Sequence, residues 1–258
     1  MHAVVIDRVV GDPAVLAQRA AVALGMTAFD VRASLQVPGG GPAIIAVHAD
    51  AADATTTASA LAQAGFAVET IDVEAQRHVP GGFVGRWFEF GEQAIALDTR
   101  DARRAAVPYA SVDLVLLVMA ITTDERNEVV REKVFSPGRA LLSGGLVNTR
   151  TRETAQRSTS MDSEEIAFVF AADGVFRLAE KSLVDQGLAG ALQPARTANF
   201  QYLVAELRRR CPQAIFDDRL RKRSLQAQVL GRVLSPDDYL ELAVTMFATS
   251  LRRSRAQP

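Results

Sequence analysis

The segment from Arg86 to Met119 constrains the fold of this chain more than any other part of the sequence. Its apolar residues alternate with polar ones over residues 87–90 and 94–97, and they merge into one apolar run over residues 114–118. Alternation with a period of two is typical of β-strands that bury one face. The segment therefore predicts three consecutive antiparallel strands separated by polar turns, in a domain that presents surfaces to other molecules.

The first 76 residues predict a small α/β domain whose helices are marked by capping residues. Pro13 follows Asp12 at the start of the first helix, and Gly25 ends that helix. Thr27 is suited to cap a second helix, and Gly65 closes a third. The expected elements are a strand at 3–6, helices at 13–24 and 28–35, a strand at 43–47, a helix ending at 64 and a strand at 67–73. The predicted order is β-α-α-β-α-β.

This order and three local motifs carry a resemblance to a known family. The motifs are Gly25-Met26, the acidic Asp30 in the second helix, and Ala64-Gly65-Phe66-Ala67-Val68 at the turn into the last strand. With them, residues 2–74 resemble the C-terminal domain of the bacterial ribosomal stalk protein and the related ClpS adaptor. The resemblance implies a docking module that binds a protein through its helical face. The residues expected on that face are Val31, Arg32 and Leu35.

Residues 77–85 contain one proline and three glycines, which predicts a linker between two domains. The second domain is expected over residues 86–212. It contains a hairpin signal at Asp173-Gly174, which lies between two apolar runs. It ends in an amphipathic helix at residues 198–209. The apolar stripe of that helix comprises Phe200, Leu203, Val204 and Leu207.

Strands that finish in one amphipathic helix, with Tyr109-Ala110-Ser111-Val112 among them, resemble the pleckstrin-homology-like (PH-like) domains. The resemblance covers residues 86–212 and implies an antiparallel β-barrel capped by the helix. The predicted fold class is therefore α+β. It comprises a β-α-α-β-α-β domain at 1–76, a linker at 77–85, a PH-like β domain at 86–212 and a helical extension at 213–258.

The segment from residue 136 to residue 165 is rich in glycine, serine and threonine, and it predicts a long hairpin or loop. Its arginines suggest an alternative function. In lipid-binding members of the PH-like fold, cations in a loop between strands bind phosphoinositide phosphates. The resemblance therefore implies an anionic-lipid site. The residues expected to form it are Arg139, Arg150, Arg152 and Arg157.

The helical extension predicts two helices, at residues 217–230 and 236–251. The last of them is apolar on more than one side, which favours contact with a protein partner or with a second copy of the chain, as a homodimer. The residues expected in that contact are Leu240, Leu242, Met246 and Phe247.

Residues that could catalyse a reaction or bind a metal do not form a recognisable group in the sequence. The three histidines are far apart, and Cys211 is the single cysteine, which excludes a multi-thiolate metal site within one chain. The glycine-rich segments at 38–42 and 141–146 lack the Gly-Lys-Ser/Thr ending of a phosphate-binding loop. We therefore expect no enzyme, no metal and no cofactor. A hydrolase or transferase of unfamiliar type would need His48 or Cys211 beside a buried carboxylate in a deep pocket.

The composition predicts a folded, soluble protein. Hydrophobic residues make up 48% of the chain and charged residues 23%, which is outside the range of disordered chains. The formal net charge of −1 gives no reason to expect nucleic acid as a partner. No secretory signal and no membrane-spanning apolar run are visible, and a single cysteine fits a reducing compartment. A cytoplasmic location is expected.

Two small domains without a catalytic group favour a non-catalytic cytosolic adaptor or scaffold that mediates protein–protein interaction. The alternative, from a different class, is a peripheral protein that binds anionic phospholipids through the arginine-containing loop. The sequence does not name the partner.

Overall fold

The structure is a computed structural model that describes residues 1–8, 11–37, 40–79, 82–99, 103–135 and 149–256. Over residues 122–135 and 149–160 it describes the backbone alone. The chain divides into two compact units. Unit 1 comprises residues 1–120 and 164–258, and unit 2 comprises residues 121–163. The fold class is α+β, as predicted, with three sheets among the described strands.

The N-terminal part of unit 1 has the predicted order β-α-α-β-α-β. Its elements are β1 (His2–Ile6), α1 (Pro13–Leu24), α2 (Ala28–Leu35), β2 (Ala43–His48), α3 (Ala51–Gln63) and β3 (Val68–Asp72). The strands form one antiparallel sheet in the order β2-β1-β3. The predicted caps are confirmed, because the Asp12 side chain accepts a hydrogen bond from Ala14 N at 2.9 Å and Thr27 Oγ1 accepts one from Asp30 N at 3.2 Å. Gly25 ends α1 with a φ of 63°, which suits a glycine.

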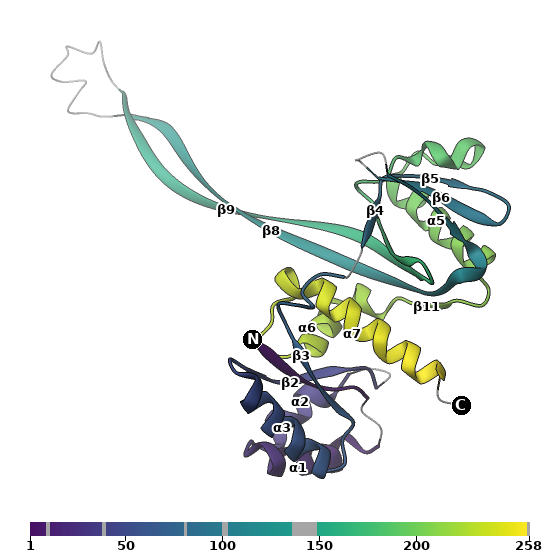
Figure 1. Cartoon of the computed structure of the whole chain (residues 1–258). Helices are drawn as coiled ribbons and strands as arrows, with labels where there is room; N and C mark the ends of the chain where they lie inside the picture. The colour runs from purple at the N-terminus through teal and green to yellow at the C-terminus, as the bar shows by residue number, and fades with distance from the viewer. Residues whose placement is uncertain (9–10, 38–39, 80–81, 100–102, 136–148, 257–258) are drawn as a thin grey trace. The chain divides into compact units, whose positions relative to one another are not determined.

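The strands after residue 80 form two sheets (Figure 1). The first, in the order β5-β6-β7, contains β5 (Trp87–Phe90), β6 (Ala94–Asp98) and β7 (Arg104–Pro108). The second, in the order β11-β8-β9-β10-β4, contains β4 (Phe83–Gly85), β8 (Val112–Phe135), β9 (Thr149–Ala171), β10 (Gly174–Ala179) and β11 (Ile215–Asp217).

The predicted barrel is not found, because no closed barrel is formed by the strands that the structure describes. The apolar run at 114–118 was expected to pair with the strands at 87–90 and 94–97, but it belongs to β8 in the second sheet. The third strand of the first sheet is β7, which the sequence analysis missed. The segment from Arg104 to Pro108 is short, and three of its five residues are alanine or proline, so it shows little alternation of apolar and polar residues.

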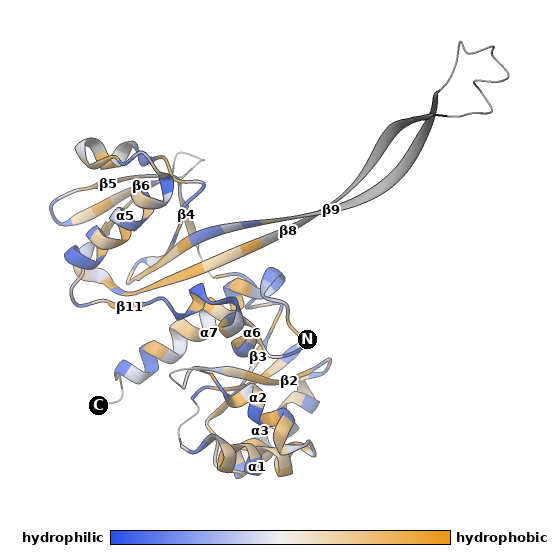
Figure 2. Cartoon of the chain, turned by 180° about the vertical axis from the view of Figure 1, so that it is seen from behind, coloured by the Kyte–Doolittle hydropathy of each residue, from blue (hydrophilic) through white to orange (hydrophobic). Residues whose placement is uncertain are grey.

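Strands β8 and β9 bury both faces inside unit 1. Leu116 and Phe168 face one cluster of apolar side chains, which we call core A, while Val115 and Val169 face a second cluster, core B. Burial on both faces explains why the sequence shows a continuous apolar run here instead of alternation. Figure 2 shows this hydrophobic part of β8 in orange.

The helices that follow cover these cores. They are α5 (Arg196–Arg210), α6 (Arg223–Leu230) and α7 (Pro236–Ala256), with short 3-10 turns η1 (Tyr109–Ser111), η2 (Asp185–Ala191) and η3 (Arg219–Arg221). The predicted stripe of α5 packs into core B, where Phe200, Leu203 and Leu207 are buried and Val204 is partly buried. The second predicted helix, at 217–230, is divided into η3 and the shorter α6.

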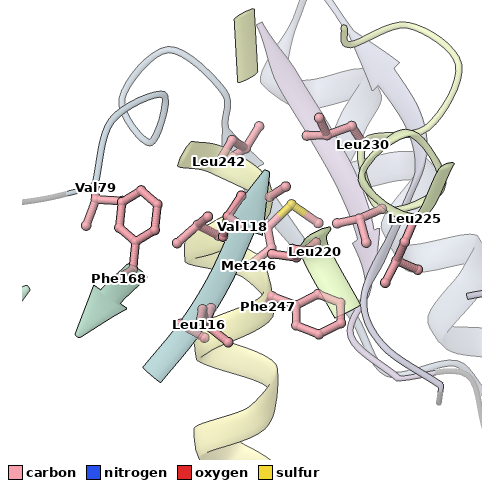
Figure 3. Packing of buried hydrophobic residues seen from close by; sticks show 14 of the residues in the cluster. Val79, Leu116, Val118, Phe168, Leu220, Leu225, Leu230, Leu242, Met246 and Phe247 are labelled. Atoms are coloured by element: carbon pink, nitrogen blue, oxygen red, sulfur yellow. The ribbon is translucent and has the colours of Figure 1, made fainter. Parts of the chain in front are cut away.

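Core A joins parts of the chain that the sequence analysis assigned to different domains. It contains Val5 from β1, Phe168 from β9 and Phe247 from α7. Figure 3 shows Leu242, Met246 and Phe247 of α7 close to Leu116 and Val118 of β8. Val79, from the predicted linker, is also buried in this cluster, and its backbone N–H donates to Glu241 Oε2 at 3.0 Å. The compact units therefore differ from the boundaries expected at residues 76, 85 and 212.

Over the described residues, none of the helices combines the length and the apolar character that crossing a membrane requires.

Candidate functional site

The predicted docking face on α2 is only partly a surface. Val31 and Leu35 are each 1% exposed, and they pack into a third cluster, core C, which lies between the N-terminal helices and the sheet. Their spacing of four residues places them on the one stripe of α2 that faces the sheet. Arg32 alone of the three is exposed. The prediction that Val31 and Leu35 are available for a partner is wrong for the folded chain.

The predicted contact on the terminal helix is also inside the molecule. Met246 and Phe247 are buried in core A, as is Leu242, and Leu240 is partly buried against the same cluster. The apolar character on several sides of α7 has an intramolecular cause. The helix packs against a cluster that contains residues of β1 and β2 as well as of β8 and β9. The prediction of a dimer through these side chains is therefore corrected.

The predicted anion-binding arginines lie outside what the structure describes at side-chain level. Arg139 falls in the undescribed segment 136–148, and Arg150, Arg152 and Arg157 belong to the part of β9 that is described by backbone alone. The anionic-lipid site stays a prediction.

The residues suggested for an unfamiliar catalytic role are not brought together. His48 Nε2 lies 3.0 Å from Thr57 Oγ1 in the N-terminal part, whereas Cys211 is buried in core B. Burial raises the pKa of the Cys211 thiol to about 11, because desolvation outweighs the favourable charge of Arg210. Among the described residues, no group of three or more His, Cys, Asp and Glu side chains is arranged to hold a metal ion.

The structure shows instead an open strand edge, at β7. Residues 93, 95, 97 and 99 pair in register with 109, 107, 105 and 103, as the bonds from Tyr109 N to Gln93 O and from Thr99 N to Arg103 O show. In an antiparallel ladder, alternate residues exchange both hydrogen bonds with the partner strand, and the residues between them point their backbone groups away. The N–H and C=O groups of Arg104 and Ala106 therefore face away from β6.

No described residue pairs with this outer edge of β7. At its end, Pro108 has no N–H, and its carbonyl accepts a hydrogen bond from Ser111 Oγ at 2.8 Å. The open stretch is therefore short. It offers two backbone donors and two backbone acceptors, at Arg104 and Ala106.

A groove of about 550 Å³ runs beside this edge. Its walls are Phe83, the start of β10 and the first residues of β7, and its lining comprises Phe83, Arg103–Ala106 and Asp173–Phe176. The rings of Phe83 and Phe176 lie 5.6 Å apart at 54° and form an aromatic floor. An extended chain in the groove would have both an unpaired strand and an apolar surface within reach.

The charge of the groove depends on two arginines. Arg104 forms a fork with Asp98, with Nε–Oδ1 at 2.8 Å and Nη2–Oδ2 at 3.1 Å, and this hydrogen bonding lowers the pKa of Asp98. Arg103 lies over the Phe83 ring at 5.7 Å, and no described carboxylate forms an ion pair with it. Because Asp173 also lines the groove, the positive charge is local to the Arg103 end.

Sequence reasoning missed this site because it missed β7. One signal was present: Pro108 ends the segment, and proline within a β region is found on edge strands or at strand ends. The opposing wall, at Phe83 and Phe176, is distant in sequence and could not have been paired with β7 without the fold.

Comparison with the models of known protein families, with curated proteins and with solved structures gives no match to this chain.

Proposed function

We propose that this protein is a non-catalytic cytosolic adaptor that binds an extended segment of a partner protein at the β7 edge. The observation that carries the proposal is the open edge at Arg104 and Ala106 beside an aromatic-floored groove. Strand addition uses main-chain hydrogen bonds for affinity and neighbouring pockets for selectivity, and both are present here. The resemblances to ClpS-like and PH-like domains, which stay predictions, favour the same class of function.

The partner segment has a defined chemistry in this proposal. An apolar side chain would lie against the Phe83 and Phe176 rings, and an acidic side chain would lie near the Arg103 guanidinium. The paired Arg104 contributes little net charge, since Asp98 neutralises it. We therefore expect a short extended segment with one acidic residue and a bulky apolar residue.

The test selects such segments from a displayed peptide library with the full chain as bait. Binding is then measured for Ala106→Pro, which removes the outward N–H, and for Ala106→Ser, which keeps it. We expect the proline variant to bind about tenfold more weakly, because one hydrogen bond is lost and the edge is blocked. The serine variant should bind as the parent does. A thermal unfolding curve for each variant separates loss of binding from loss of fold.

Amide hydrogen exchange gives the second readout. Bound peptide should slow exchange at Arg104 and Ala106 and leave the inward amides of Ala105 and Val107 unchanged. Selected peptides that bind Ala106→Pro as tightly as the parent, or that protect neither outward amide, would refute strand addition at this edge. The lipid alternative is tested separately, by sedimentation of the chain with anionic and neutral vesicles at low salt.

A further inference from the structure

A second cleft, distinct from the β7 groove, lies where β8 and β9 leave the apolar cores. Its volume is about 360 Å³. It is lined by Leu117 of β8, Glu165 of β9, a face of α5, and the turn that carries Asp218 and Arg221. The α5 residues that line it are Phe200, Gln201, Val204, Ala205 and Arg208. All of these residues belong to unit 1. A cleft of this size, mainly apolar with a few polar groups, is typical of sites for small molecules.

Two of the four charged groups in the cleft neutralise each other. Glu165 is 5% exposed, and Arg221 holds its carboxylate as a fork, with Nε–Oε1 at 3.0 Å and Nη2–Oε2 at 3.3 Å. Both carboxylate oxygens are therefore occupied. Among the described residues, Arg221 is the only arginine that pairs with Glu165, and its Nη1 is not part of this fork.

Arg208 differs from the two arginines that follow it. Arg209 and Arg210 both pair with Glu206, at 2.8 Å and 3.0 Å, and Arg210 also donates to Gly91 O. For Arg208, the described residues provide no carboxylate partner, and its guanidinium lies over the Phe216 ring at 5.0 Å. Stacking on a ring leaves the in-plane N–H donors of a guanidinium free for an anion. An uncompensated cation therefore borders the apolar wall of the cleft.

We propose that this cleft binds a small carboxylate with an apolar body. The carboxylate would accept hydrogen bonds from Arg208, and the apolar body would pack against Leu117, Phe200 and Val204. Arginine presents two parallel N–H donors that match a carboxylate, so an acid is favoured over a neutral molecule of the same shape. Asp218 also lines the cleft, and its negative charge opposes an anion. Its removal should therefore strengthen binding.

The experiment titrates the full chain with 4-methylpentanoate, 4-methylpentanamide and 3-methylbutylamine, which share an apolar body and differ in charge. Binding is followed by the NMR signal of the Arg208 side-chain Nε–H and by calorimetry. We expect the carboxylate to bind at least about tenfold more tightly than the amide, because a charge-assisted hydrogen bond is lost in the amide. The amine should bind more weakly than the amide, since it is repelled by Arg208, the cation that no described carboxylate neutralises.

Variants on one helix provide matched controls. Arg208→Gln should weaken carboxylate binding about tenfold, whereas Arg209→Gln, which removes a cation paired outside the cleft, should leave it unchanged. Asp218→Asn should tighten binding. Ala205→Phe fills the cleft from its exposed side and should abolish binding without disturbing core B. Equal binding of acid and amide, equal effects of the Arg208 and Arg209 variants, or no binding at millimolar ligand would each overturn the proposal.

Discussion

Strands β8 and β9 pass through two regions that share a backbone conformation and differ in composition. In unit 1, residues 114–118 and 166–171 are apolar and buried on both faces of the sheet. In unit 2, seven of the 15 residues from 121 to 135 are charged. β11 pairs with residues 114–116 of β8, and β10 pairs with residues 166–171 of β9. Elsewhere along their length, β8 and β9 have only each other as strand neighbours among the described residues. The difference teaches that a strand can continue from an apolar segment into one that is rich in charged residues.

An isolated two-stranded ribbon is marginally stable in water, because it buries little apolar surface. The five-stranded sheet therefore supplies the stability on which unit 2 depends, and we expect unit 1 to gain little from unit 2. Three experiments test this asymmetry.

The largest effect is expected inside unit 1. Phe168 is 1% exposed in core A, so Phe168→Ala should lower the free energy of unfolding by about 3–5 kcal/mol. Met161 lies on the same strand but is 69% exposed, and Met161→Ala should change it by less than about 0.5 kcal/mol. Urea denaturation of both variants measures the contrast. Similar losses of unfolding free energy for the two variants would show that the stabilising part of β9 extends to Met161.

A smaller effect is expected at the boundary itself, at Glu165. Burial raises the pKa of this carboxyl; Arg221 acts in the opposite direction, and Glu180 and Asp218 add to the rise. The native chain therefore keeps the proton to a higher pH than the unfolded chain does. This contribution to stability is present at low pH and is lost as the pH rises from the ordinary range of glutamate through the raised pKa.

Glu165→Gln removes this titration. The free energy of unfolding of the parent, relative to the variant, should fall as the pH is raised from about 4 to about 8. Chemical denaturation at several pH values measures it. If the relative stability instead increases with pH, the pairing with Arg221 outweighs burial, and the ionised Glu165 carboxylate stabilises the fold.

The smallest effect is expected from removing the ribbon. Replacing residues 123–160 by Asn-Gly, which favours a tight hairpin turn, should leave unit 1 folded. Its free energy of unfolding should change by less than about 1 kcal/mol, since all the core residues that the structure describes lie outside the deleted range. Loss of cooperative unfolding in this variant would contradict the asymmetry and show that unit 2 contributes to the core.

Local signals predicted much of the fold. Asp12, Thr27 and Gly25 marked the helix ends correctly, because a cap depends on neighbours in sequence. The stripe of α5 was correct for Phe200 and Leu207, since helical periodicity shows directly which face is apolar.

Pairing between distant segments could not be predicted in the same way. The run at 114–118 is apolar whether it lies in a barrel or in a sheet with two covered faces, and the same ambiguity affects Met246 and Phe247 on α7. A helix face that binds a partner and one that packs into the chain's own core have the same apolar sequence pattern. The β7 edge and the α5 cleft depend on long-range geometry, and Pro108 was the one local signal for the first of them.

The place of α7 in core A affects how the chain can fold as it leaves the ribosome. One face of β1 and β2, with Val5 and Ile44, shares this core with Leu242 and Phe247. The N-terminal segment thus emerges with an apolar sheet face whose cover is synthesised much later. Until α7 is made, we expect that exposed face to bind chaperones or to promote aggregation. Core A can form completely only after α7 has been synthesised.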